Sequence, residues 1–256
     1  MNKLKYDRYF YFDELNKFNN LIHFYTKKPF NFNSNIVSEM QIKDSYKIIS
    51  NDFNYNFSKI KKCIQNHTNT VKIVDSNNVD DDFVNVDGLI TNLKNVSLVT
   101  YLADCQAILL YDPVKKVIGN IHSGWKGTLN KILENAIKIM INDFSCNPSN
   151  IIACICPSIL GCCFEVDEDV MLMFKKTFYD YNKYINLGNI ENDKQKYYID
   201  TVKININIMK NIGIRDDNII CSNVCTKCNS DVYHSYRKDK DKSGRNIALI
   251  CLKDYD

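Results

Sequence analysis

The stretch that decides the fold of this chain is ADCQAILLYDPVKKVIGNIHSGWKG, residues 103–127. Two apolar runs in it, residues 106–111 and 117–121, flank the turn sequence Asp-Pro-Val-Lys-Lys. Asp followed by Pro favours a type I turn, so we expect the two runs to pair as an antiparallel hairpin. An antiparallel pair argues against a purely parallel sheet. Together with the helices expected elsewhere, it predicts a mixed α+β fold with mixed or antiparallel sheets.

Further strands are predicted where apolar and β-branched residues run between polar turns. They cover residues 21–26, 70–74, 96–103, 151–156, 218–222 and 246–252. The first 62 residues give weak periodic signals, from which we expect short strands and a helix near residues 57–63.

The clearest predicted helix follows His122 directly. Its apolar residues recur at helical spacing: Leu129, Ile132, Leu133, Ala136, Ile137 and Met140. A second helix is expected from Asp167 to about Phe178. The isoleucines of residues 200–213 alternate as in a strand, but Asp200 as N-cap and Gly213 after the last turn favour a helix.

Length and composition are those of a globular protein. The chain has 256 residues, of which 45% are hydrophobic and 25% charged, enough for a sizeable core. Few glycines and prolines and no linker predict one domain over residues 1–256. No apolar run approaches the roughly 18 residues that span a bilayer, and the charged N-terminus resembles no export signal. We therefore expect a cytoplasmic protein with no membrane partner, and a net charge of +3 is too small to indicate nucleic-acid binding.

Eleven cysteines in a long chain of this kind are expected to be reduced thiols, most of them buried as small apolar side chains. The segment CSNVCTKC, residues 221–228, has the C-x3-C-x2-C spacing of some iron–sulfur loops. Such a loop normally opens a barrel strand, and its C-x2-C lacks the second pair of a zinc ribbon. We expect no metal cluster there, and we expect Cys162 and Cys163 to be structural.

Cys105 and His122 lie at the outer ends of the two hairpin strands. If the turn is centred between Pro113 and Val114, the two residues face each other with Cβ atoms about 5 Å apart. A thiolate and an imidazole so placed can share one metal ion. The alternative is that Cys105 is a buried apolar side chain and His122 a hydrogen-bonded loop residue. His122 also lies in a glycine-bracketed turn that enters a helix, which suits an anion site.

A metal site of this kind needs a third ligand, and the chain holds three further histidines. His23 lies in the apolar stretch LIHFY and is interpreted as a core histidine. His234 lies in a basic segment. His67, just before a predicted strand, is the best candidate for the third ligand.

Six motifs occur along the chain in one order: QNH (65–67), VDGLIT (86–91), LADC (102–105), HSGWKG (122–127), GCCFEV (161–166) and CTKCNSDVYHSYRKDKDKSGR (225–245). This order resembles the YfiH/laccase-domain family of zinc-dependent purine nucleoside phosphorylases. The resemblance covers about residues 60–252. Each motif alone is weak, and the combination is specific.

The resemblance implies a single-domain αββα sandwich with three zinc ligands, which are His67, Cys105 and His122 in this chain. Three protein ligands with an open fourth position are typical of a catalytic zinc site. The resemblance also implies phosphate-dependent cleavage of adenosine, inosine and guanosine, action on methylthioadenosine, and deamination of adenosine.

The chain departs from the family pattern at three places. Thr68 follows the first histidine where glycine is usual, and Lys126 follows the tryptophan where arginine is common. TKKPF, residues 26–30, stands where the family has a T-R-x-G-G segment.

Phosphorolysis needs an oxyanion held in line with the glycosidic carbon, and cations do this well. Lys126, Arg237 and Arg245 are the candidates for binding phosphate. Asp104 is the candidate for proton transfer or for support of the metal ligands. The alternative for residues 237–245 is a solvated loop, since their charges alternate in sign around Ser-Gly.

Three other functions stay open. A Cys105–His122 dyad suits a cysteine hydrolase. A copper-dependent polyphenol oxidase is disfavoured, because a multicopper site needs far more than four histidines. A non-catalytic nucleoside-binding protein would keep the same fold. Nothing in the sequence indicates an oligomeric state.

Overall fold

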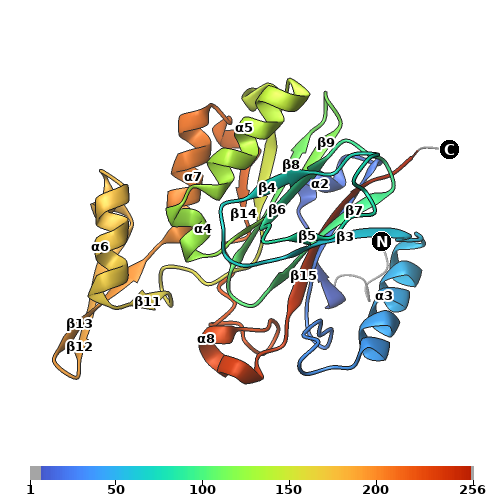
Figure 1. The fold of residues 1–256 in the computed structure, drawn as a ribbon. Coiled ribbons are helices and arrows are strands. Elements are labelled where there is room, and N and C mark those ends of the chain that lie inside the picture. Colours follow the sequence, from blue (N-terminus) through green and yellow to red (C-terminus); the bar gives the residue numbers. More distant parts are fainter. Residues whose placement is uncertain (1–6, 255–256) are drawn as a thin grey trace.

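Two mixed six-stranded sheets face each other in the computed structural model, which describes residues 7–254 (Figure 1). The first sheet has the order β1 (Tyr9–Phe10), β2 (Leu21–Thr26), β15 (Asn246–Leu252), β7 (Val96–Leu102), β3 (Lys59–Ile64) and β5 (Phe83–Val84). The second has the order β14 (Ile219–Cys221), β10 (Ile152–Ile155), β8 (Gln106–Asp112), β9 (Val117–Ser123), β6 (Gly88–Thr91) and β4 (Val71–Ile73). Parallel and antiparallel pairs occur in both sheets, which confirms the predicted mixed α+β fold.

Helices cover the outer faces of both sheets, which gives αββα layering (Figure 1). α3 (Glu39–Phe53) covers the first sheet, where Ile49 packs with Phe24 and Val99. α5 (Ile132–Phe144) and α7 (Thr201–Ile212) cover the second. The other helices are α2 (Asp13–Asn16), α4 (Trp125–Leu129), α6 (Glu168–Thr177) and α8 (Tyr236–Asp239), with 3-10 turns at 148–150, 181–183, 216–218 and 240–242. None of the described helices is long and apolar enough to cross a membrane.

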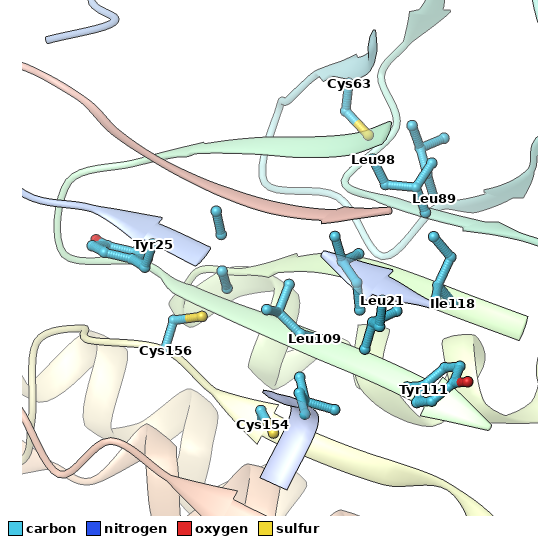
Figure 2. Packing of buried hydrophobic residues seen from close by; sticks show 14 of the residues in the cluster. Leu21, Tyr25, Cys63, Leu89, Leu98, Leu109, Tyr111, Ile118, Cys154 and Cys156 are labelled. Atoms are coloured by element: carbon cyan, nitrogen blue, oxygen red, sulfur yellow. The ribbon is translucent and has the colours of Figure 1, made fainter. Parts of the chain in front are cut away.

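The main core fills the space between the two sheets. Leu98 of β7 belongs to one hydrophobic cluster with Leu89, Leu109 and Ile118 of the opposite sheet, and all four side chains are fully buried (Figure 2). Burial of each such side chain stabilises the fold by about 1.5–3 kcal/mol relative to exposure. The alternating apolar residues of both sheets therefore hold the layers together.

One buried polar side chain, Asn120 of β9, also links the two sheets. Its Nδ2 donates to the carbonyl oxygens of Leu98 and Ala248, each at 2.9 Å. Its Oδ1 accepts a hydrogen bond from the Thr100 hydroxyl, also at 2.9 Å. All of its amide's polar atoms are thus paired across the interface between the layers.

The hairpin of β8 and β9 forms as predicted, but its register differs. Ala107 is the residue opposite His122, so the expected direct pairing of Cys105 with His122 was wrong by two positions. Asp112 accepts hydrogen bonds from two backbone N–H groups of the turn and so fixes this register. A shift of two residues keeps each side chain on the same face, and Cys105 still lies beside His122.

The helices differ from the prediction at three places. The helix expected near residues 57–63 was wrong, because this segment forms β3 between β7 and β5. α3 was missed, although a capping box between Ser38 and Gln41 marks its start. The helix expected after His122 is broken in two between α4 and α5, where Lys131 adopts a φ of 57°. The predicted helices after Asp167 and Asp200 are present as α6 and α7.

A third, small sheet extends away from the body beside α6 (Figure 1). It has the order β11 (Glu165–Val166), β13 (Lys194–Ile199) and β12 (Ile185–Glu191). The β12–β13 turn consists of Asn192 and Asp193, whose φ angles of 49° and 60° suit a two-residue hairpin loop. We expected no strands here from the sequence.

Candidate active site and metal centre

A cavity of about 580 Å³ opens where the ends of β8 and β9 meet the loops after β3, β10 and β14. Its size is in the range of small-molecule sites. Its lining includes four aromatic rings, two arginines and three side chains that could bind a metal ion: Tyr101, Trp125, Phe164, Tyr236, Arg237, Arg245, His67, Cys105 and His122. The sequence pointed to most of these side chains from motifs that lie far apart along the chain.

His67, Cys105 and His122 meet on one wall of this cavity, with their ligand atoms all within 4.8 Å of one another. His67 lies in the loop after β3, Cys105 lies just before β8, and His122 lies near the end of β9. The Sγ of Cys105 is 3.7 Å from the Nε2 of His67. Sulfur and nitrogen ligands on one tetrahedral zinc ion would be about 3.6 Å apart, given typical zinc–ligand bonds. The donor set and its spacing therefore fit a single zinc ion.

Asp87, which directly precedes β6, holds both histidines of this site in place. Its Oδ1 is 2.7 Å from Nδ1 of His122 and accepts the backbone N–H of His67 at 3.0 Å. Its Oδ2 accepts the backbone N–H and the hydroxyl of Thr68, each at 2.7 Å. A carboxylate on Nδ1 leaves Nε2 as the metal-facing nitrogen of His122. Thr68, where the family has glycine, contributes to this network through its hydroxyl.

The charges around Cys105 and His122 favour a thiolate beside an imidazolium. Burial alone would raise the pKa of Cys105, but the neighbouring His122 and His67 lower it to about 6. Burial alone would lower the pKa of His122, but Cys105 and Asp87 raise it to about 9. Burial opposes ionisation of Asp87 too, yet hydrogen bonds from His122 and Thr68 hold its pKa well below the ordinary value. Thiolate is the form of cysteine that binds metals.

Gly124, the N-cap of α4, lies directly against His67 and Cys105, two of the three candidate metal ligands. A Cβ atom at this position would be 2.7 Å from Cδ2 of His67 and 3.1 Å from Sγ of Cys105. The absence of a side chain therefore lets the turn into α4 approach the ligands closely. α4 itself has five residues, so the long helix expected at this anion site is not formed.

Asp104 is buried next to the cavity, but its carboxylate is engaged by two neighbouring loops. Oδ1 accepts the hydroxyl of Thr226 at 2.7 Å, and Oδ2 accepts the backbone N–H of Arg237 at 2.6 Å. Its φ of 82° is rare for a residue with a side chain. Such strain persists only where surrounding contacts enforce it, and here they fix the chain just before Cys105.

The three predicted phosphate-binding cations are placed differently. Arg237 and Arg245 line the cavity. The Arg237 guanidinium lies over the Phe164 ring, 5.5 Å from its centroid, and donates to the Glu165 carbonyl oxygen. Lys126 is not among the lining residues, and its ammonium lies 5.5 Å from the centroid of the Trp125 ring.

The two remaining histidines lie outside the metal site. His23 is buried and accepts the backbone N–H of Phe12 at 2.9 Å, which confirms its interpretation as a core histidine. His234 is hydrogen-bonded to the Phe30 carbonyl oxygen. Two histidines and one cysteine are also the ligands of blue-copper sites, but a multicopper cluster would need more imidazoles than this cavity contains.

The sequence interpretation missed Asp87, although VDGLIT was among the motifs. The available signal was an acidic residue inside an otherwise apolar strand segment, which requires a partner when it is buried. It also missed the aromatic lining residues Tyr101 and Phe164, which look like ordinary core residues in the sequence.

Comparison with known proteins gives consistent matches. The family model described as multi-copper polyphenol oxidoreductase laccase matches residues 29–253. The chain is 35% identical over 168 residues to purine nucleoside phosphorylase YlmD of Bacillus subtilis, covering 66% of this chain and 59% of that protein. It is 34% identical over 233 residues to a purine nucleoside phosphorylase of Borreliella burgdorferi, covering 88% and 90%. The crystal structure of hypothetical protein YfiH from Bacillus licheniformis superimposes with a TM-score of 0.86 at 25% identity, covering 96% of this chain and 97% of that one.

Proposed function

The chain belongs to the multi-copper polyphenol oxidoreductase laccase family, and we propose that it cleaves purine nucleosides with inorganic phosphate. Adenosine, inosine and guanosine are the proposed substrates, and the products are the free base and ribose 1-phosphate. The family membership agrees with the motif resemblance. The names of the relatives from Bacillus subtilis and Borreliella burgdorferi support the reaction class.

The observation that carries this proposal is the shared cavity of the His67–Cys105–His122 triad and the two arginines. A nucleoside and phosphate together need apolar faces for the base, a polar wall, and fixed positive charge. Trp125, Phe164 and Tyr236 provide aromatic faces in the same cavity. Because the cavity takes residues from both sheets, we also propose that residues 1–256 act as one domain.

In the proposed reaction, an oxygen of phosphate forms a bond to C1′ of the ribose. The bond from C1′ to N9 of the purine breaks, its electron pair stays on N9, and the purine takes up a proton. Arg237 and Arg245 would hold the phosphate against C1′, since guanidinium pairs well with oxyanions. Lys126 would have to leave the Trp125 ring to assist them.

His67, Cys105 and His122 would hold a zinc ion, which would supply Lewis acidity or an activated water to a substrate bound beside it. Deamination of adenosine to inosine, in which water replaces the C6 amino group and ammonia leaves, is part of the same proposal. Methylthioadenosine, which lacks the 5′-hydroxyl, is a further proposed substrate.

The proposed role of Asp104 is mainly to position Arg237. Its carboxylate ties the Thr226 loop to the backbone of Arg237 and so sets where the Arg237 side chain enters the cavity. Proton transfer would require one of these two hydrogen bonds to open. The Asp104→Asn variant is expected to raise the KM for phosphate more than it lowers kcat.

The first test is incubation of the zinc-loaded protein with adenosine, with and without phosphate, and chromatography of the products. Adenine and ribose 1-phosphate that appear only with phosphate are the expected result. Inosine formed regardless of phosphate would make deamination the main activity. Absence of any product from protein with bound zinc would overturn the proposal.

A cysteine hydrolase is the second candidate, and one observation favours it. Cys105, His122 and Asp87 are linked in the order of a nucleophile, a base and an orienting carboxylate. Iodoacetamide distinguishes the two functions. If zinc is bound, it protects Cys105 from alkylation and activity is retained, whereas a hydrolase loses activity at once.

A further inference from the structure

A second group of cysteines lies outside the candidate active site. Cys162 and Cys163 belong to the turn between β10 and β11, and Cys225 and Cys228 to the loop after β14. The four sulfur atoms all lie within 4.8 Å of one another. From the sequence, the C-x2-C of residues 225–228 lacked a second pair, but folding brings the adjacent cysteines of GCCFEV to it.

We propose that these four cysteines bind one zinc ion as a structural site, separate from His67, Cys105 and His122. Four sulfurs on one tetrahedral zinc ion lie about 3.8 Å apart, given zinc–sulfur bonds of about 2.3 Å. Sγ of Cys228 is 3.9 Å from that of Cys162 and 3.4 Å from that of Cys163. The observed spacing brackets the expected one.

The local backbone supports a ligand role for Cys225. Cys225 is buried, and its sulfur lies within 4.8 Å of the sulfur atoms of Cys162, Cys163 and Cys228. The turn between the two cysteines is closed by Asn229, whose backbone N–H and side-chain amide both donate to the Cys225 carbonyl oxygen. This turn points both sulfurs of the C-x2-C to the same side, as a shared metal ion requires.

Other uses of four close cysteines fit the geometry less well. All eleven cysteines are free thiols in the structure, and two disulfides would draw the sulfurs into separate pairs about 2.0 Å long. A four-iron cluster holds its cysteines around a body much larger than one ion. Cys163 and Cys225 are buried and Cys162 and Cys228 are exposed, so a single ion could reach the group from the surface.

The zinc ion would join the two loops that shape the active-site cavity. Thr226, next to Cys225, donates to Asp104. Phe164, next to Cys163, lines the cavity, and Arg237 donates to the carbonyl oxygen of Glu165. The site would therefore position Arg237 and Phe164 without contacting substrate.

The test is the zinc content of the full chain, purified under reducing conditions and measured by elemental mass spectrometry. Two zinc ions per chain are expected. One is expected in Cys162→Ser/Cys228→Ser, which changes the two exposed ligands, and one in His67→Ala/His122→Ala. The control Cys221→Ser, in neighbouring β14, is expected to keep both.

Cobalt substitution gives a second readout that does not depend on activity. Co²⁺ bound to four thiolates in His67→Ala/His122→Ala is expected to show strong sulfur-to-cobalt charge-transfer absorption. That absorption is expected to be lost when Cys162→Ser and Cys228→Ser are added. The absorption of His67→Ala/His122→Ala tests the inference even if the serine variants fold poorly, because this protein keeps all four cysteines.

A single zinc ion in the wild type that persists in Cys162→Ser/Cys228→Ser would overturn the inference. So would an iron–sulfur absorption spectrum, or a Cys163–Cys228 disulfide in protein prepared with zinc present. None of these outcomes depends on whether the chain cleaves nucleosides, so the inference and the proposed function fail separately.

Discussion

Asp87 is the side chain on which both histidines of the candidate metal centre depend. In Asp87→Asn, an amide NH₂ would face N–H donors that now point at a carboxylate oxygen. Loss of such support typically costs 10–100-fold in metal affinity, and we expect a decrease of about that size. Competition with a chromogenic chelator measures it.

The matched control for this variant is Asp112→Asn at the far end of the β8–β9 hairpin. Asp112 is also buried and also accepts backbone N–H groups. The Asp112→Asn variant should lower the free energy of unfolding and leave metal affinity unchanged. Equal loss of affinity in both variants would show that Asp87 acts only through general stability.

His23 gives the fold a specific sensitivity to acid. Burial lowers the pKa of His23 to about 4, whereas the unfolded chain has the ordinary value of about 6.5. Between these values the unfolded state binds more protons, so stability falls as pH falls from about 6.5 to about 4. The loss from this residue alone is at most about 3 kcal/mol.

Urea unfolding at several pH values in wild type and His23→Gln checks this. Gln keeps an acceptor for the Phe12 N–H but does not titrate. The difference in unfolding free energy between the two proteins should shrink as the pH falls, and titration of the other groups cancels in the comparison. Parallel curves would contradict the assignment.

At the scale of single residues, the sequence identified the three side chains that could bind a metal ion, but it did not identify the carboxylate that supports them. His67, Cys105 and His122 occur in motifs, and two of them end predicted strands. Asp87 acquires its role only when β6 pairs with β9 and brings it to His122, 35 positions away in sequence. No local pattern encodes that meeting.

At the scale of elements, the turn into α4 requires glycine at position 124, because a side chain there would contact the candidate metal ligands. In Gly124→Ala, the added Cβ would lie 2.7 Å from the His67 ring and displace it. We expect metal affinity to fall by about tenfold or more, as for other disturbed ligand geometries. Isothermal titration with zinc, in a chain lacking Cys162 and Cys228, measures this site alone.

The control for Gly124→Ala is Gly127→Ala, one turn later in the same helix. A Cβ atom at Gly127 would meet Ile132 Cγ2 at 3.3 Å and the carbonyl oxygens of Thr68 and His122 at 3.4 and 3.7 Å, but no ligand side chain, so affinity should be retained. If both variants bind zinc as tightly as the wild type, the close approach at Gly124 has no role in shaping the site.

α7 was predicted from signals at both of its ends, whereas β3, which depends on pairing with a distant strand, was not. Asp200 caps α7 through the Lys203 N–H and Gly213 ends it at a φ of 100°, as the sequence indicated. β3 could not be identified in this way, because KIKKCI becomes a strand by pairing with β7, some 37 positions away. The predicted hairpin register was wrong because the turn that Asp112 closes is centred one residue later than we assumed.

At the scale of the whole molecule, Asn120 is the polar link between the two sheets. Asn120→Ala removes three hydrogen bonds and leaves buried carbonyl groups without that donor. We expect a loss of about 2–4 kcal/mol in unfolding free energy. Thr100→Val, which removes one of the three bonds and keeps the shape, should cost about 1 kcal/mol.

Urea denaturation measures both variants. A loss below about 0.5 kcal/mol in Asn120→Ala, within the range of ordinary surface substitutions, would mean that these hydrogen bonds do not stabilise the fold.

The order of the layers was predicted only from the family resemblance. Periodicity indicates which faces of the elements are apolar, but it does not indicate which face covers which.

The small β12–β13 hairpin extends from the body and ends in the exposed Asn192–Asp193 turn. A cut between these two residues would divide the chain into two pieces. The second piece carries α7, β14 and β15, and β15 lies between β2 and β7 in the middle of the first sheet. After cleavage at an engineered protease site, we expect one species in size exclusion and two bands on a denaturing gel. The fold is therefore a natural candidate for splitting into two separately produced fragments that reconstitute a complete cavity only when they meet.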